Sequence, residues 1–295
     1  MKEFTIKAAE RLSCMKAHTL RVWEQRYGIL QPTRKKDSNH RVYTNREMKA
    51  LLKIVHLYHL GLKISEIANL KEDEVDKLMQ QSNKGEWSIE VLLVELKEAI
   101  IDFDNLSFER KLDQLIRRLG MKDALLGVIF PLLNQIGLLW LTDKVVPGQE
   151  HFASNIIMRK LLKAIDEVVV SRVQRRGLVL LFTPQGEYHE IPLLFFRYLL
   201  LSKGYNTVYL GVSVPVEVVQ EFCEKYKPTH LLVHFTSNLQ SPVIPDFLKN
   251  LHTISPDSKI VAAGPALQHY QFEGNNISIL SSEKEMLAFC ENIFD

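Results

Sequence analysis

The sequence predicts a multi-domain chain: an α winged helix-turn-helix head, a four-helix bundle, and an α/β doubly wound, Rossmann-like parallel sheet. Three observations predict this fold class. The first 75 residues follow the order helix, turn, helix, basic hairpin, helix. Four helical stretches with short connections come next, as in a bundle. The remaining residues alternate apolar runs of strand length with helical stretches, which indicates a parallel sheet covered on both faces. The expected boundaries are 1–78 for the head, 79–88 for a polar linker, 89–173 for the bundle and 174–295 for the sheet domain.

The elements of the head are predicted by apolar spacing and turn residues. Apolar residues at helical spacing indicate a short helix over 6–12 and a second helix over about 16–27. The run 31–43 begins with a Gln-Pro step and is polar, basic and rich in turn formers, which favours a β-hairpin wing. Thr44-Asn45-Arg46-Glu47 then provides the capping signal of a long helix that ends near Leu60.

The bundle is predicted by four helical stretches separated by helix-breaking residues. They are expected at about 89–103, 107–119, 121–142 and 148–172, with breaks at Asp104-Asn105, Gly120 and Pro147-Gly148. The third stretch contains 19 residues without a charge, 124–142, which is long enough to cross a bilayer. Because Pro131, Asn134 and Gln135 lie at its middle, we expect a helix buried among other helices and no membrane partner.

The sheet domain is predicted by five continuous apolar runs. The strands are expected at 178–182, 208–210, 231–235, 260–263 and 277–280, and the intervening helices at about 190–203, 215–226, 243–254 and 283–293. Ligands of doubly wound sheets bind beyond the carboxyl ends of the strands. Residues that directly follow these runs are therefore the candidates for a ligand site.

Charge is distributed unevenly along the chain. Residues 1–70 carry 14 Lys and Arg against 6 Asp and Glu, a net charge of +8, whereas the remainder carries 23 against 29. A basic head on an acidic body suggests a polyanionic partner, and the alternative is a solvated basic surface. Cys14, Cys223 and Cys290 lie far apart, as expected for thiols in a reducing compartment, and the N-terminus has no apolar core of a secretory signal. We expect a cytoplasmic protein.

The basic residues of the head lie where DNA would be read. The helix at 16–27 is expected in the major groove, with Thr19, Arg21, Arg26 and Tyr27 able to reach phosphates or base edges. The wing carries Arg34, Lys35, Lys36, His40 and Arg41, a cationic tip suited to the narrow minor groove.

These residues also match a known family. The run 19–28, Thr-Leu-Arg-Val-Trp-Glu-Gln-Arg-Tyr-Gly, followed by Asn-His-Arg-Val-Tyr at 39–43, strongly resembles the MerR family, and its Trp-Glu-x-Arg-Tyr-Gly pattern resembles the CarH/LitR/MlrA branch. The resemblance implies dimeric binding to a palindromic promoter site. Leu20 and Trp23 are expected in the core. The expected DNA-binding set is Thr19, Arg21, Arg26, Tyr27, Arg34, His40, Arg41 and Tyr43.

Two histidine clusters stand out in the body. His189 follows the first apolar strand within Gly186-Glu187-Tyr188-His189-Glu190, where its imidazole nitrogen could ligate a metal while a nearby carboxylate fixes the tautomer. Trp140 closes the uncharged helix, and Glu150 and His151 begin the next, so the three could cover a flat ligand. The alternatives are an ordinary surface histidine for the first cluster and a capped helix beside a packed tryptophan for the second.

Taken together, the clusters resemble the cobalamin-binding module of methionine synthase and CarH-type photoreceptors. The resemblance implies that His189 of Glu187-x-His189 is the lower axial ligand of cobalt, and that Ser237-x-Leu239 and Gly264 border the nucleotide tail. It also implies that Trp140, Glu150 and His151 cover the upper adenosyl group. The pattern departs in three places: Pro192 replaces a glycine, Ala263 replaces the first of two paired glycines, and Leu141 stands where some relatives have a histidine.

The favoured hypothesis is a DNA-binding transcription regulator, a repressor by expectation, that senses adenosylcobalamin and responds to light. The cofactor would drive association into a dimer or tetramer and tighten binding to promoter DNA. The alternative keeps DNA binding but gives the sensor no cobalamin, as a ligand-free dimerisation domain or a site for another tetrapyrrole. A corrinoid-carrying enzyme subunit is a third hypothesis, and we expect no enzyme because such subunits need no wing.

Overall fold

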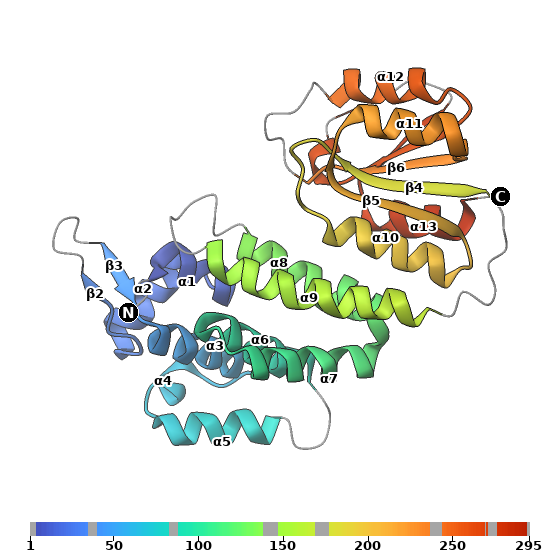
Figure 1. Cartoon of the computed structure of the whole chain (residues 1–295). Helices are drawn as coiled ribbons and strands as arrows, with labels where there is room; N and C mark the ends of the chain where they lie inside the picture. Colours follow the sequence, from blue (N-terminus) through green and yellow to red (C-terminus); the bar gives the residue numbers. More distant parts are fainter. Residues whose placement is uncertain are drawn as a thin grey trace. The chain divides into compact units, whose positions relative to one another are not determined.

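The computed structural model describes residues 4–34, 40–82, 88–137, 147–168, 177–236, 244–268, 270 and 276–293. The chain divides into two compact units, Met1–Ile157 and Met158–Asp295 (Figure 1). The first unit contains the head and most of the helical region, and the second contains the sheet. The predicted fold class is confirmed in all three parts.

The head begins with two helices, α1 (Ile6–Ser13) and α2 (Ala17–Tyr27), joined by a turn in which Cys14 adopts φ 57°. The predicted wing forms from β2 (Thr33–Arg34) and β3 (Arg41–Tyr43), which pair antiparallel. A strand that the sequence did not predict, β1 (Phe4–Thr5), pairs with the other edge of β3. The wing is therefore part of a three-stranded sheet and is anchored to the start of the head.

The long third helix, α3 (Asn45–His59), begins where the capping signal predicted it. Thr44 Oγ1 accepts a hydrogen bond from the Glu47 backbone N–H, and the Glu47 carboxylate accepts one from the Thr44 N–H, so both ends of the capping box are made. Two further helices follow, α4 (Ile64–Ile67) and α5 (Glu72–Ser82). Residues 79–82, expected in the linker, thus belong to α5.

The helices of the helical region follow one another as predicted. Its elements are α6 (Ile89–Asp102), α7 (Asn105–Ala124), the π-helical turn η1 (Leu125–Ile129), α8 (Phe130–Gly137) and α9 (Pro147–Glu167). The predicted break at Gly120 is present, because this residue adopts φ 79° within α7. Among the described residues, the run 105–137 is long and apolar enough to cross a membrane by length and composition alone, but α7 packs against α6 and α8 packs against α1.

The head and the first bundle helix share one hydrophobic cluster. Val91, Val94 and Ile101 of α6 belong to the same buried cluster as Met48 and Leu51 of α3. Burial of apolar side chains on both sides of this contact is the main force that joins two packed helices. The expected boundary near residue 88 therefore separates two stretches of sequence but not two hydrophobic cores.

The second unit is a five-stranded parallel sheet in the order β5-β4-β6-β7-β8. Its strands are β4 (Leu178–Pro184), β5 (Asn206–Val214), β6 (His230–His234), β7 (Lys259–Ala263) and β8 (Ile277–Leu280). Its helices are α10 (Ile191–Ser202), α11 (Val216–Tyr226), α12 (Ile244–Ile254) and α13 (Glu283–Asn292), with the short η3 (Pro265–Leu267) after β7. Figure 1 shows α10 and α13 on one face and α11 and α12 on the other, the doubly wound arrangement.

Candidate DNA-binding and cofactor-binding sites

The exposed side of α2 carries the residues expected to meet DNA. Arg21, Arg26 and Tyr27 are exposed and Thr19 is half-buried, whereas Leu20 and Trp23 lie in the core as predicted. Alternation of exposed cationic and buried apolar positions results from the helical period, because residues three or four apart share a face. The exposed face of α2 can therefore approach a phosphate backbone while its other face holds the head together.

The wing is clamped to α2 by Glu24. The Glu24 carboxylate, largely buried, accepts a hydrogen bond from Arg41 Nε at 2.7 Å and another from the Tyr43 hydroxyl. Tyr43 has no exposed surface, and burial followed by the Glu24 hydrogen bond raises the pKa of its hydroxyl. The expectation that Tyr43 contacts DNA therefore needs correction, because its buried hydroxyl bonds Glu24 and attaches the wing strand β3 to α2. Arg41, in the same strand, is half-buried.

Of the remaining residues expected in the wing, the structure describes two. Arg34 and His40 are both exposed at the ends of the hairpin strands. Lys35 and Lys36 lie outside the described residues. The described part of the wing thus presents two residues of the predicted set to solvent.

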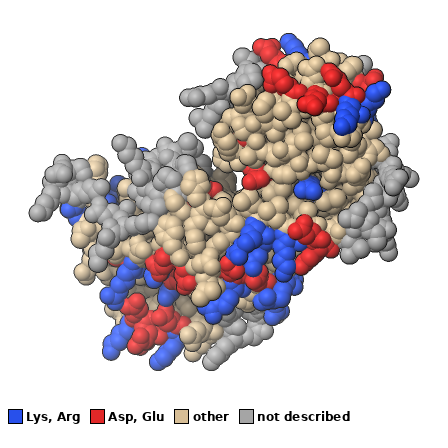
Figure 2. Space-filling model, viewed as in Figure 1, with Lys and Arg blue, Asp and Glu red and all other residues tan. Residues whose placement is uncertain are grey.

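The basic residues of α3 are engaged within the protein. Each pairs with an acidic side chain from beyond residue 70: Arg46 with Glu72 (2.6 Å), Lys49 with Asp102 (2.5 Å), and Lys53 with Asp76 (2.7 Å) and Glu98 (3.5 Å). On the face drawn in Figure 2, Lys and Arg side chains of the first unit lie among Asp and Glu side chains. The net charge of +8 over residues 1–70 therefore overstates the charge available to DNA, since part of it is neutralised by α5 and α6.

We expect Arg21→Ala to lower the affinity for a random-sequence DNA duplex about tenfold. The substitution removes an exposed guanidinium of α2 and, with it, one contact to a DNA phosphate. Lys49→Ala should leave the affinity within about twofold, because its ammonium already pairs with Asp102. Fluorescence anisotropy over a series of salt concentrations measures both. A loss of affinity confined to Lys49→Ala would place the DNA surface on α3 instead.

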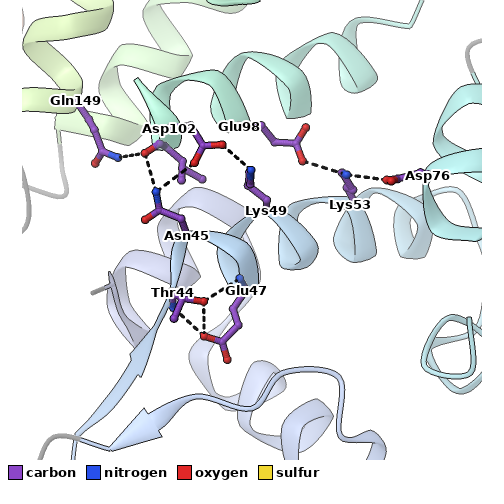
Figure 3. A network of polar contacts seen from close by, with 10 residues as sticks. Thr44, Asn45, Glu47, Lys49, Lys53, Asp76, Glu98, Asp102 and Gln149 are labelled. Carbon is purple, nitrogen blue, oxygen red and sulfur yellow. Dashed lines mark hydrogen bonds and ion pairs between the residues drawn. The ribbon is translucent and has the colours of Figure 1, made fainter. Parts of the chain in front are cut away.

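The first unit also contains a polar network that no sequence motif indicates (Figure 3). Asn45 Nδ2, at the start of α3, donates to the Ile101 carbonyl and to Asp102 Oδ1, both at 3.2 Å. Gln149 Nε2, in the first turn of α9, donates to the same Ile101 carbonyl at 3.0 Å. Three helices distant in sequence thus meet at the end of α6, and only their packing could show it.

Two further contacts attach the bundle to α1. Lys97 Nζ of α6 donates to the Leu12 carbonyl at 2.9 Å, and burial lowers the pKa of this ammonium. Gln135 Nε2 of α8 lies 3.5 Å from Cys14 Sγ, in the turn between the two helices of the helix-turn-helix. The carbonyls at the end of α1 have no partners within their own helix, so Lys97 satisfies one of them.

The start of α9 carries the expected upper residues Glu150 and His151. His151 Nδ1 lies 3.3 Å from Glu150 Oε2, and the imidazole is mostly exposed. The Ser154 hydroxyl donates to the other Glu150 oxygen, one turn further along the helix. The carboxylate is thus held between two partners with the imidazole beside it, but Trp140 lies outside the described residues.

His189 lies in the loop between β4 and α10, at the carboxyl edge of the sheet. Its Nδ1 is 2.6 Å from Glu187 Oε1, which also accepts the His189 backbone N–H at 3.0 Å. The Glu187 side chain is buried, and its second oxygen accepts the Thr236 backbone N–H after β6 at 2.9 Å. With the Nδ1 proton directed at a carboxylate, the neutral imidazole carries its ring lone pair on Nε2, the nitrogen that a metal would bind.

The loop that carries His189 is held from β5. The Thr183 hydroxyl donates to the Glu187 carbonyl at 2.6 Å, and the Ser213 N–H donates to Thr183 Oγ1 and to the Glu187 carbonyl at 2.9 and 3.1 Å. His234, at the end of β6, is buried. Burial lowers the pKa of its imidazole to about 4, although the negative charge of Glu187 acts in the opposite direction. His234 is therefore neutral at physiological pH.

Gly264 follows β7 and is required by backbone packing. It adopts φ 122°, and a Cβ added there would lie 2.2 Å from the Phe235 carbonyl oxygen. The methyl group of Ala263, one residue earlier, is completely buried, and Pro192 lies in the first turn of α10, where proline is compatible with a helix. Two of the departures are therefore accommodated by the fold. Leu141, Ser237 and Leu239 lie outside the described residues.

Among the described residues, no group of three or more His, Cys, Asp or Glu side chains could hold a bare metal ion. A corrin differs from a bare ion because its macrocycle supplies four nitrogen ligands and leaves the axial positions to the protein. A single half-exposed imidazole whose Nδ1 is bound by a buried carboxylate suits that requirement. The donor set at His189 fits cobalt in such a ring.

Comparisons with known proteins identify two domains in the chain. Residues 4–74 match the family described as MerR HTH family regulatory protein, and residues 92–164 match the family described as B12 binding domain. The chain thus combines a MerR helix-turn-helix head with a B12-binding domain. The B12-binding match covers α6 to most of α9, and the sheet follows it in the chain.

Two relatives match most of the chain in sequence. The HTH-type transcriptional repressor CarA of Myxococcus xanthus is 27% identical over 238 residues, which are 78% of this chain and 75% of CarA. The HTH-type transcriptional repressor CarH of the same organism is 26% identical over 271 residues, 90% of this chain and 89% of CarH. The protein is therefore a homologue of these repressors at modest identity.

A solved structure supports the fold. The monomethylamine corrinoid protein of Methanosarcina barkeri superimposes with a TM-score of 0.54 at 15% identity, covering 68% of this chain and 96% of that protein. At this identity the likeness concerns the fold alone.

Proposed function

We propose that this protein is a cytoplasmic transcription regulator, a repressor, which binds promoter DNA through α2 and the wing and whose binding depends on adenosylcobalamin. The observation that carries the cofactor assignment is the Glu187–His189 pair at the carboxyl edge of the sheet, with Nδ1 2.6 Å from a buried carboxylate. The DNA-binding part rests on the exposed basic face of α2 and on the MerR match. Association into a dimer or tetramer would link several heads and strengthen DNA binding by avidity.

Each residue of the proposed cofactor site has a defined task. His189 binds through Nε2, Glu187 holds the imidazole in the tautomer that makes Nε2 the ligand, and Thr183 and Ser213 hold the loop. By the family resemblance, Glu150, His151 and Trp140 are proposed to contact the adenosyl group when the cofactor is bound. Bound adenosylcobalamin would supply a cobalt ion that His189 could ligate and a cobalt–carbon bond that light would break. We propose a response to light as well, because breaking that bond would change the bound cofactor.

We expect the protein, mixed with adenosylcobalamin in darkness, to retain the cofactor through desalting. Its absorption spectrum should be that of cobalt ligated by an imidazole. His189→Ala should lose that spectral form and bind at least about tenfold more weakly, as metal sites do when a ligand is removed. His252→Ala, on the exposed surface of α12, is the matched control and should leave both unchanged.

The result that contradicts the assignment is a wild-type spectrum identical to that of His189→Ala. A protein that retains no cobalamin at all would support the ligand-free dimerisation domain instead. Size-exclusion chromatography of the same samples, before and after illumination, reports whether the cofactor changes the assembly. Methyl transfer with a partner protein would instead support the corrinoid-carrying enzyme subunit.

A further inference from the structure

The end of α6 depends on side chains from two other helices. The last four carbonyls of a helix have no partner within it, and Ile101 carries one of them. Its oxygen accepts the Gln149 amide at 3.0 Å and the Asn45 amide at 3.2 Å. Phe103 turns the chain away at φ 56°, so the carbonyl remains directed at these two donors. One acceptor therefore joins α9 to α3.

The two donors come from positions that matter for the proposed function. Gln149 is buried in the first turn of α9 and directly precedes Glu150 and His151. Asn45 is the first residue of α3, two positions after Tyr43 in the wing strand β3. Figure 3 shows both amides directed at the end of α6. The Ile101 carbonyl thus lies between the proposed upper ligand residues and the base of the wing.

The orientation of the Asn45 amide is determined by its surroundings. Its nitrogen faces two acceptors, the Ile101 carbonyl and Asp102 Oδ1, so the reversed amide would place oxygen against oxygen. Asp102 in turn accepts the Lys49 ammonium at 2.5 Å, one turn further along α3. The first two turns of α3 are therefore attached to the last turn of α6, through Asn45 and Lys49.

The geometry points to Gln149 and Asn45 as positioning residues that transmit the ligand state of the start of α9 to α3 and the wing. This inference rests on the proposed function. Ligand contacts made by Glu150 and His151 shift the first turn of α9, and the Gln149 amide, in the same turn, moves with them. A hydrogen bond weakens steeply when its distance or angle changes, so the Ile101 carbonyl and the Asn45 amide respond to that shift. The ligand thereby biases the orientation of the wing relative to α2.

Hydrogen–deuterium exchange of the full-length protein tests this transmission without knowledge of the operator. Adenosylcobalamin added in darkness should slow exchange in the segment 44–55 of the wild type about fivefold, a factor of the size one hydrogen bond supplies. Gln149→Met keeps the length of the side chain but removes the donor, and should abolish that slowing while the cofactor spectrum remains. Gln80→Met, at an exposed position of α5, is the control and should behave as the wild type.

A second variant approaches the link from α3. Asn45→Ala should abolish the same slowing, and the double variant should lose no more than either single one, because both act through one carbonyl. Slowing that persists in Gln149→Met and Asn45→Ala overturns the transmission while leaving the cofactor site intact. If the wild type shows no cofactor spectrum, the proposed function fails, and the link is then judged without cofactor: Gln149→Met must exchange faster than Gln80→Met in segment 44–55, and equal rates overturn it.

Discussion

Gly264→Ala is expected to destabilise the second unit by about 4 kcal/mol or more, the range reserved for severe steric or backbone strain. The new Cβ would lie 2.2 Å from the Phe235 carbonyl oxygen, and φ 122° is strained for any side chain. The carbonyl cannot retreat easily, because Phe235 N–H donates to the Ala263 carbonyl at 2.8 Å and its own oxygen accepts the Ala266 N–H. Urea unfolding followed by circular dichroism measures the loss.

Gly186→Ala is the matched control for this substitution. Gly186 has φ 87°, but nothing lies within 4 Å of an added Cβ, so only the backbone strain of about 1 to 2 kcal/mol applies. A Gly264 variant no less stable than the Gly186 variant would show that the close approach to Phe235 is absent. The comparison also bears on function, because the close packing requires glycine at 264 whether or not a cofactor tail passes there.

Glu24→Ala is expected to cost about 3 kcal/mol of stability in the first unit and to weaken DNA binding. The substitution removes the acceptor of both Arg41 and Tyr43, leaving a buried hydroxyl without its partner and a guanidinium without its counter-charge. Since the two residues belong to β3, the wing loses its attachment to α2. Thermal unfolding and DNA-binding anisotropy, measured on the same preparations, report the two effects.

Glu72→Ala provides the comparison for an ion pair in solvent. The Arg46–Glu72 pair is exposed on both sides, and such pairs contribute little to stability. The Glu72→Ala variant should therefore have the same unfolding temperature as the wild type. If both variants unfold together, the Glu24 clamp contributes no more than a surface ion pair, and the wing must be held by other contacts.

The candidate site was predicted unevenly from the sequence. His189 and Glu187 could be found because a histidine and a carboxylate two residues apart follow an apolar strand, and the parallel sheet then places them at its carboxyl edge. Thr183 and Ser213 carry no such signal, because they act through hydrogen bonds between strands β4 and β5. Tyr43 was misassigned as a DNA contact because an aromatic residue in a wing looks the same in sequence whether it faces DNA or the core.

Local sequence by itself determined most elements of this protein: the two helices of the helix-turn-helix, the break at Gly120, the capping box at Thr44 and the basic side chains of α2 all depend on residues close together in the chain. Tertiary structure alone decided which charges of the head remain available, since Lys49 and Lys53 are neutralised by Asp102 and Glu98 across a helix contact. It likewise decided that β1 completes the wing sheet and that Ile101 joins α3 to α9. The reason is physical: periodicity and capping act over a few residues, whereas pairing of charges and of backbone carbonyls depends on which surfaces pack together.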